Sequence, residues 1–364
     1  MTAPLAAPVA FRGGTVCGNH LALAPLTNGQ SEDDGVLGDD ELRWLTRRAA
    51  GGFGLVETCA AHVAEDGKAF DGQLGVWSDR HLPGLTRLAT AIAGHGALGV
   101  VQLHHGGVRA PSRLTGVQPW SASAFTEDKP GFEPPRAATD DDLARVIGQF
   151  RDAAARSRQA GFAGVELHGA HGYLLSQFLS RTMNQRTDRW GAGLDGRARL
   201  LREVTRAVRA VAPPPFVLGV RISAEDFGQA HGLDLDESLQ VASWLADDGI
   251  DYLHLSLWDV ERPTAKRPDE LALPLFRAQL PADVRIMVAG KVWTRADAER
   301  QLERGADLIA VGRAAIVDPD WPRHVAFGSD EPRRPPLTRD ELRAVDVGEK
   351  FVTYLQNFRG MVAA

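Results

Sequence analysis

The amino-acid sequence predicts an α/β fold, a (β/α)8 TIM barrel with extended βα loops, on two observations. Short apolar runs bounded by Gly, Pro or Asp recur eight times, and amphipathic segments with a helical period separate most of them. The length of 364 residues exceeds the usual single-domain size, but barrels of roughly 250 residues grow past 400 through loop insertions. We therefore expect one domain over residues 1–364, with the barrel at about 19–328 and a C-terminal tail at about 329–364.

The eight apolar runs are the expected barrel strands. Their continuous Val, Ile and Leu character suits parallel strands that are buried on both faces. In chain order the expected strands are 21–24, 54–57, 98–103, 164–167, 217–222, 252–255, 286–289 and 308–311.

Helices are expected after most of these strands. Asp39 and Thr294 are expected N-caps, because their side-chain oxygens can accept the free amide hydrogens of a first turn. Gly249 and Gly305 stand where a left-handed residue can end a helix. The expected helices are 39–50, 83–93, 140–159, 197–211, 236–247 and 294–303.

Two long segments, 109–139 and 174–197, interrupt the regular alternation, and each follows a strand. Barrel enzymes build their sites from such βα loops at the C-terminal ends of the strands. We therefore expect the chemistry of this chain at that end of the barrel.

Composition narrows the class of protein. The formal net charge of -6 comes from interspersed acidic and basic residues, and no basic face indicates a nucleic-acid partner. Cys17 and Cys59 are the only cysteines, which favours a reducing, cytoplasmic setting. The start of the chain, residues 1–11, has no signal-peptide pattern, and no apolar run approaches the ~18 residues that span a bilayer. We therefore expect neither secretion nor a membrane span.

The strongest chemical signal is the segment 166–173, which leaves the fourth strand with two histidines and a tyrosine. If the chain turns helical there, His168 and His171 share a face at i, i+3 spacing. Two neutral imidazoles so placed can donate to one carbonyl or nitro oxygen and draw electron density from a conjugated alkene. Tyr173 carries a phenol that can act as general acid. A histidine pair in the core with a packing tyrosine is the alternative from these residues alone.

Polar groups also end other strands. Gln102 can donate to and accept from a heterocyclic ring edge, and Arg221 in an apolar strand is costly unless it meets an anion, an electron-rich ring or a salt-bridge partner. Gly290 and Gly312 follow the seventh and eighth strands, where barrels bind phosphate through backbone amides. Glycine at a strand end can also serve only a turn.

With these residues in place, the sequence from about 19 to 319 resembles the old yellow enzyme family of NAD(P)H:flavin oxidoreductases. The resemblance rests on the His-x-x-His-Gly-Tyr segment, the long loop 176–197, the first-strand segment 24–27 and the third-strand segment 102–107. It implies a tightly but non-covalently bound FMN, NADPH or NADH as reductant, and activated alkenes as small-molecule substrates. No metal is implied.

The resemblance also implies roles for particular positions. His168 and His171 activate the substrate, and Tyr173 donates the proton. The implied contacts to the FMN are backbone contacts at Ala24, Pro25, Leu26 and Thr27, with the Thr27 hydroxyl near the flavin O4/N5 edge. Ring contacts are implied at Ala60, Gln102 and Arg221, and phosphate contacts at Gly290, Gly312 and Arg313.

Several alternatives stay open. Asn28 and Gly29 replace an aromatic residue that some subgroups place over the pocket, so Trp120 or Phe125 is a candidate for the pocket wall. The tail 354–359, with Arg359, either reaches a neighbouring subunit in a homo-oligomer or forms a surface helix. The rival functions are a catalytically silent ligand-binding barrel and a metal-dependent barrel lyase or hydrolase. The ligands of that metal would be Glu57, His105, His168 and His171.

Overall fold

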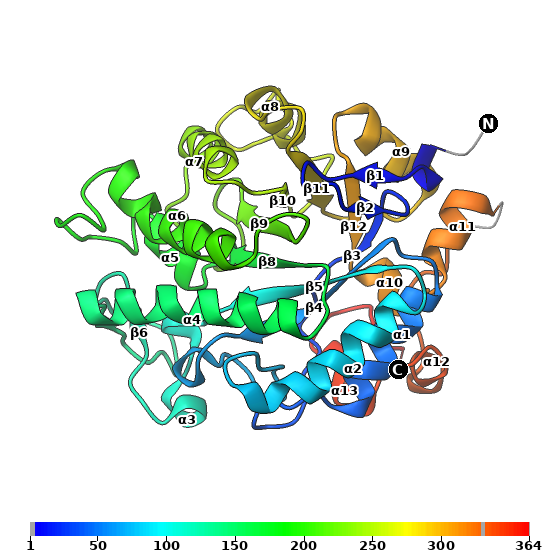
Figure 1. Ribbon diagram of the computed structural model, residues 1–364, viewed down its shortest axis with the longest axis horizontal. Coiled ribbons are helices and arrows are strands. Elements are labelled where there is room, and N and C mark those ends of the chain that lie inside the picture. Colours follow the sequence, from blue (N-terminus) through cyan, green and yellow to red (C-terminus); the bar gives the residue numbers. More distant parts are fainter. Residues whose placement is uncertain (1–3, 329–331, 364) are drawn as a thin grey trace.

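The structure is a computed structural model that describes residues 4–328 and 332–363 (Figure 1). Residues 1–3, 329–331 and 364 lie outside the described ranges. These residues include the start of the N-terminal stretch and the first residues of the expected tail.

Eight parallel strands close into a barrel, as the sequence predicts. Each strand pairs with the next in chain order, and the last pairs with the first through Ile309 and Leu21. Expected and observed strands agree closely, except that the second runs to His62 rather than to residue 57. The barrel strands are β3 (Leu21–Leu23), β4 (Leu55–His62), β5 (Leu98–His104), β8 (Gly164–Gly169), β9 (Val217–Ser223), β10 (Tyr252–Ser256), β11 (Arg285–Ala289) and β12 (Leu308–Val311).

Helices surround the barrel (Figure 1). All six expected helices are present, with ends that differ by at most three residues. The helices that follow the barrel strands are α1 (Asp39–Ala50), α2 (Leu82–Ala93), α4 (Asp140–Gln159), α6 (Leu194–Val211), α7 (Leu235–Asp247), α8 (Ala272–Gln279), α9 (Arg295–Glu303) and α10 (Arg313–Val317).

Short elements fill the loops and the two ends of the described chain. The strands are β1 (Val9–Ala10), β2 (Val16–Cys17), β6 (Trp120–Ser121) and β7 (Arg136–Ala137). The α-helices are α3 (Ser112–Thr115), α5 (Leu174–Leu179), α11 (Trp321–Phe327), α12 (Arg339–Ala344) and α13 (Glu349–Leu355). The 3-10 helices are η1 (Pro4–Ala6), η2 (Glu65–Gly67), η3 (Asp79–His81) and η4 (Gly107–Arg109).

The helix ends show one wrong expectation. Asp39 is the first residue of α1 rather than its N-cap; Gly38 holds that position, and no side chain caps the helix. Thr294 does cap α9, in a capping box with Asp297. Gly249 and Gly305 both adopt the expected left-handed conformation, with φ of 102° and 105°.

Residues from the β1–β2 region close the N-terminal end of the barrel. Val9, Phe11 and Cys17 are buried in one apolar cluster with strand residues such as Leu55. Phe11 packs on the Tyr252 ring at a centroid distance of 5.9 Å. The barrel is therefore packed at this end and can open only at the other.

A buried arginine on α1 binds the C-terminal part of the chain to the barrel. Arg48 of α1 donates to the carbonyl oxygens of Ala315, Ile316 and Val345 at 3.1, 3.0 and 2.7 Å. Phe351 of α13 packs on Trp44 of α1, with ring centroids 5.6 Å apart. These contacts hold α13 beside the C-terminal ends of the strands. Within the described residues, no helix is long and apolar enough to cross a membrane.

Candidate active site

A cavity of about 600 Å³ opens at the C-terminal ends of the barrel strands. Every residue expected to be catalytic or to contact the FMN lines it. These residues are Ala24, Pro25, Leu26, Thr27, Ala60, Gln102, His168, His171, Tyr173, Arg221, Gly290, Gly312 and Arg313.

The two histidines meet through a turn rather than along a helix, so the expected helical geometry is wrong. His168 belongs to β8, and His171 adopts a left-handed conformation with φ of 62°. This turn brings His168 Nε2 within 2.9 Å of His171 Nδ1. Burial lowers the pKa of both imidazoles well below the usual range, so both are neutral at neutral pH.

Further groups extend the pair at both ends. His104 of β5 places its Nδ1 3.1 Å from His168 Nδ1, and His171 Nε2 lies 2.6 Å from the Ser256 hydroxyl. The same hydroxyl accepts a hydrogen bond of 3.0 Å from Arg221 Nη2. His104, His168, His171, Ser256 and Arg221 therefore form one continuous hydrogen-bonded series.

Tyr173, the residue before α5, packs against the histidines of this hydrogen-bonded series. Its ring centroid is 4.9 Å from that of His168 and 4.3 Å, edge-on, from that of His104. The Arg109 guanidinium lies over the Tyr173 ring, 4.1 Å from its centroid, and donates to the His171 carbonyl oxygen at 2.9 Å. Tyr173 is thus held by packing on several sides, which limits the positions of its hydroxyl group.

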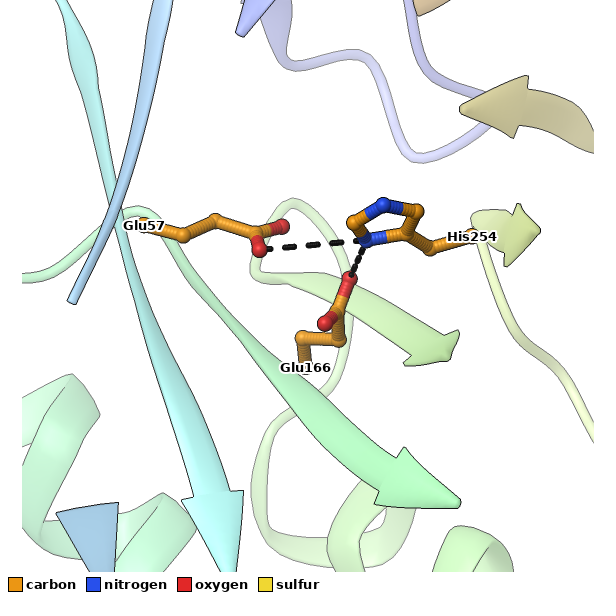
Figure 2. A group of neighbouring side chains, drawn as sticks. All are labelled: Glu57, Glu166 and His254. Carbon is orange, nitrogen blue, oxygen red and sulfur yellow. Dashed lines mark hydrogen bonds and ion pairs between the residues drawn. The ribbon is translucent and has the colours of Figure 1, made fainter. Parts of the chain in front are cut away.

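Below the cavity, Glu57, Glu166 and His254 point toward one another from β4, β8 and β10 (Figure 2). His254 Nδ1 is 2.8 Å from a Glu166 oxygen and 3.9 Å from a Glu57 oxygen. The other Glu166 oxygen accepts from the Gln102 amide at 2.7 Å, which leaves the Gln102 carbonyl oxygen free to face the cavity.

The two carboxyl groups of this cluster differ in charge. Burial, together with repulsion from Glu166, raises the pKa of Glu57 well above its usual range. Burial acts on Glu166 as well, but attraction to His254 and Arg221 outweighs it and lowers the Glu166 pKa. One buried negative charge on Glu166 therefore faces the positive Arg221, and Glu57 stays neutral.

Tyr252 extends the cluster because a glycine makes room for it. Its hydroxyl donates to Glu57 at 2.9 Å. A Cβ atom on Gly219 would lie only 2.0 Å from the Tyr252 ring, so the neighbouring strand must carry glycine at this position. Small and large residues thus interlock across β9 and β10.

Gly290 and Gly312 lie where backbone must approach closely. A Cβ atom on Gly290, whose φ is 158°, would come within 2.7 Å of the Leu257 carbonyl oxygen. A Cβ atom on Gly312 would come within 2.9 Å of Leu26. Both glycines line the cavity together with Arg313.

The metal ligands considered from the sequence are not brought together. Glu57 groups with Glu166 and His254 in the described part of the chain, not with His105, His168 or His171. His105 instead faces Asp66 at 3.6 Å and packs on Trp120. The metal-dependent alternative is therefore not favoured.

Several cavity residues were missed by the sequence reasoning. Trp120 and Phe125 do not line the cavity; Trp120 packs on His105, and Phe125 on Phe132. The aromatic walls come from later loops and from α13. The missed lining residues include Arg109, Phe227, Ser256 and Trp258. Tyr354 and Phe358 belong to the tail 354–359, which was expected either at a neighbouring subunit or on the surface, and they line the cavity of their own chain.

Comparison with known proteins identifies the class. The profile of the NADH:flavin oxidoreductase / NADH oxidase family matches residues 4–331. The chain is 36% identical over 334 residues to the probable NADH-dependent flavin oxidoreductase YqiG of Bacillus subtilis, covering 90% of this chain and 89% of that one. It is 35% identical to the NADH:fumarate oxidoreductase of Klebsiella pneumoniae, but covers only 36% of that protein. These matches define an NAD(P)H-dependent flavin oxidoreductase with FMN as its cofactor.

Solved structures agree with the sequence comparison. The old yellow enzyme homologue from Zymomonas mobilis superimposes with a TM-score of 0.82 at 27% identity, covering 93% of this chain and 96% of that one. The chain belongs to the NADH:flavin oxidoreductase / NADH oxidase family, that of the old yellow enzymes.

Proposed function

We propose that this enzyme is an ene-reductase acting on α,β-unsaturated carbonyl or nitro compounds. When bound, FMN would supply the redox chemistry, which is hydride transfer from NAD(P)H to the β-carbon of the alkene. The protein residues supply the rest, which is to bind the acceptor, polarise it and protonate it.

The cavity residues fit an FMN. Arg221 is buried and lines the cavity, and its Nε has no hydrogen-bond partner among the described residues. A buried guanidinium donor is costly to leave unpaired, and the flavin ring edge offers acceptors. Gly290 and Gly312 line the cavity without a side chain, so their backbone can come close to a phosphate.

The proton donor in this proposal is Tyr173, and the single observation that carries the proposal is its place beside the histidine pair. A carbonyl or nitro oxygen that accepts hydrogen bonds from His168 and His171 would place the adjacent alkene near the Tyr173 phenol. Donors aimed at that oxygen stabilise the negative charge that grows on it in the transition state. Tyr173 then transfers its proton to the α-carbon.

The test compares two phenols of the same cavity. Tyr173→Phe should slow reoxidation of the reduced flavin by 2-cyclohexenone by about 10²–10⁴-fold, the usual contribution of a general acid, and should change reduction by NADPH much less. Stopped-flow absorbance of the flavin measures the two half-reactions separately.

Tyr354→Phe is the matched control, because Tyr354 lines the same cavity and carries the same group. It should slow the enone reaction less than about tenfold. Equal slowing of both half-reactions by Tyr173→Phe, or equal effects of the two variants, would remove Tyr173 as the donor.

A further inference from the structure

His104 touches the candidate catalytic residues without lining the cavity. Its side chain is completely buried on β5, in edge-on contact with Tyr173 and 3.1 Å, Nδ1 to Nδ1, from His168. No substrate can reach it. Any effect of His104 on the reaction must therefore pass through His168 or Tyr173.

The contact between two Nδ1 atoms links the tautomers of the two rings. Burial lowers the pKa of His104 well below its usual range, as it does for His168 and His171, so each ring carries one N–H. A hydrogen bond between two such nitrogens requires one N–H and one bare nitrogen. The same holds for the contact of 2.9 Å between His168 Nε2 and His171 Nδ1.

Only two arrangements satisfy all of these contacts. In the first, His104 donates from Nδ1, and His168 and His171 both carry their proton on Nε2. In the second, every proton moves to the other nitrogen: His168 and His171 carry theirs on Nδ1, and His104 carries its own on Nε2.

The environment of His104, at the buried end of the hydrogen-bonded series, decides between these two arrangements. His104 Nε2 is buried and has no hydrogen-bond partner among the described residues. The first arrangement leaves a bare nitrogen there, whereas the second leaves an orphaned N–H, which buried sites tolerate less often. At the other end, Ser256 already accepts from Arg221 and can accept again from His171 Nε2–H.

We propose that His104 is a positioning residue that holds His168 in the Nε2–H tautomer and so makes His168 and His171 a double donor for the substrate oxygen. The inference rests on the proposed function of that pair. An oxygen entering the cavity replaces His171 Nδ1 and Ser256 as the acceptor of the two Nε2–H groups. In the other arrangement His168 would offer it a bare Nε2, which repels an oxygen.

Two substitutions of nearly the same shape exchange a donor for an acceptor at this place. His104→Asn keeps an N–H donor near the position of Nδ1. His104→Asp puts an acceptor there, so the contact then requires the proton of His168 on Nδ1. Both variants are studied with FMN bound.

The first measurement is the tautomer itself, read from the ¹⁵N shifts and two-bond couplings of histidine side chains. We expect Nε2–H on His168 in the wild type and in His104→Asn, and Nδ1–H in His104→Asp. Nδ1–H on His168 in the wild type overturns the inference without any variant.

The second measurement is the Kd of 4-hydroxybenzaldehyde, an unreactive carbonyl probe, from the flavin absorbance of the oxidised enzyme. We expect binding about tenfold weaker in His104→Asp, the value of about one hydrogen bond, and within about threefold of wild type in His104→Asn. Equal Kd values in all three proteins overturn the inference. Absence of enone reduction by a wild type with the Nε2–H tautomer would instead reject the proposed function alone.

Discussion

Glu57 and Glu166 show how one residue sets the charge of another inside a barrel. Both carboxyl groups are fully buried, and a second negative charge there would face only one arginine, Arg221. Because Glu57 keeps its proton, the cluster is close to neutral. The charge of Arg221 can then act partly on the cavity above it.

This charge assignment predicts that two chemically identical substitutions change the free energy of unfolding by very different amounts. Glu57→Gln replaces a neutral carboxyl with a neutral amide of the same shape, which can still accept from Tyr252, so the free energy of unfolding should change by less than about 1 kcal/mol. Glu166→Gln leaves Arg221 without its buried counter-charge and should cost about 3–5 kcal/mol. Urea unfolding at pH 7.5 measures both, and similar losses for the two variants would contradict the assignment.

Position at the strand ends was enough to predict many of the residues that line the cavity, because the C-terminal ends of all barrel strands meet at one end of the barrel. The contacts between those residues were not predictable. His104 and Ser256 became visible only through pairing register, since Leu103 pairs with Leu167 and Ser256 pairs with Ser223. The sequence alone does not show the register in which two separate strands pair.

At the scale of elements, long helices were predicted and short ones were missed. Helices such as α5 and α8 are six and eight residues long, too short for a clear helical period, and tertiary packing rather than propensity stabilises them. This omission also affected the prediction of the site, because α13, which was not predicted, supplies Tyr354 to the cavity.

The cap of α9 gives a prediction at this scale. Thr294→Ala removes a side chain that accepts from the Asp297 amide, so it should lower the free energy of unfolding by about 1 kcal/mol. Thr86→Ala is the matched control. Thr86 is exposed inside α2, where alanine is the better helix former, so this change should stabilise the protein by a few tenths of a kcal/mol. Thermal or urea unfolding that gives the two variants the same sign would be inconsistent with the cap.

At the scale of the whole molecule, the barrel buries an unusual set of neutral imidazoles. Burial lowers the pKa of His62 to about 3 and that of His81 to about 4, and it also lowers the values for His104, His168 and His171. The unfolded chain can protonate these rings near pH 6.5, but the folded protein cannot.

Stability should therefore fall on the acid side. Above about pH 6.5 neither state binds these protons; below it the unfolded state binds more, so the free energy of unfolding decreases as pH falls toward the folded-state pKa values. Each ring contributes up to about 1.4 kcal/mol per pH unit. Urea unfolding between pH 7.5 and 5 should show this slope.

Removing one ring should reduce the slope by its share. His62→Gln is the test, and His95→Gln is the control, because His95 is exposed on the folded protein and meets water in both states. A slope unchanged by His62→Gln would mean that folding does not lower the pKa of the His62 ring.

The closing contact of the barrel joins Leu21 to Ile309, which are separated by most of the chain. A ribosome therefore releases β3 long before its partner β12 exists, and the free edge of β3 has backbone donors and acceptors with no strand to pair with. Contacts this distant in sequence form late and slow the folding of a chain. Until β12 has been made, the chain offers no native partner for that edge, and a strand of another molecule can compete for it.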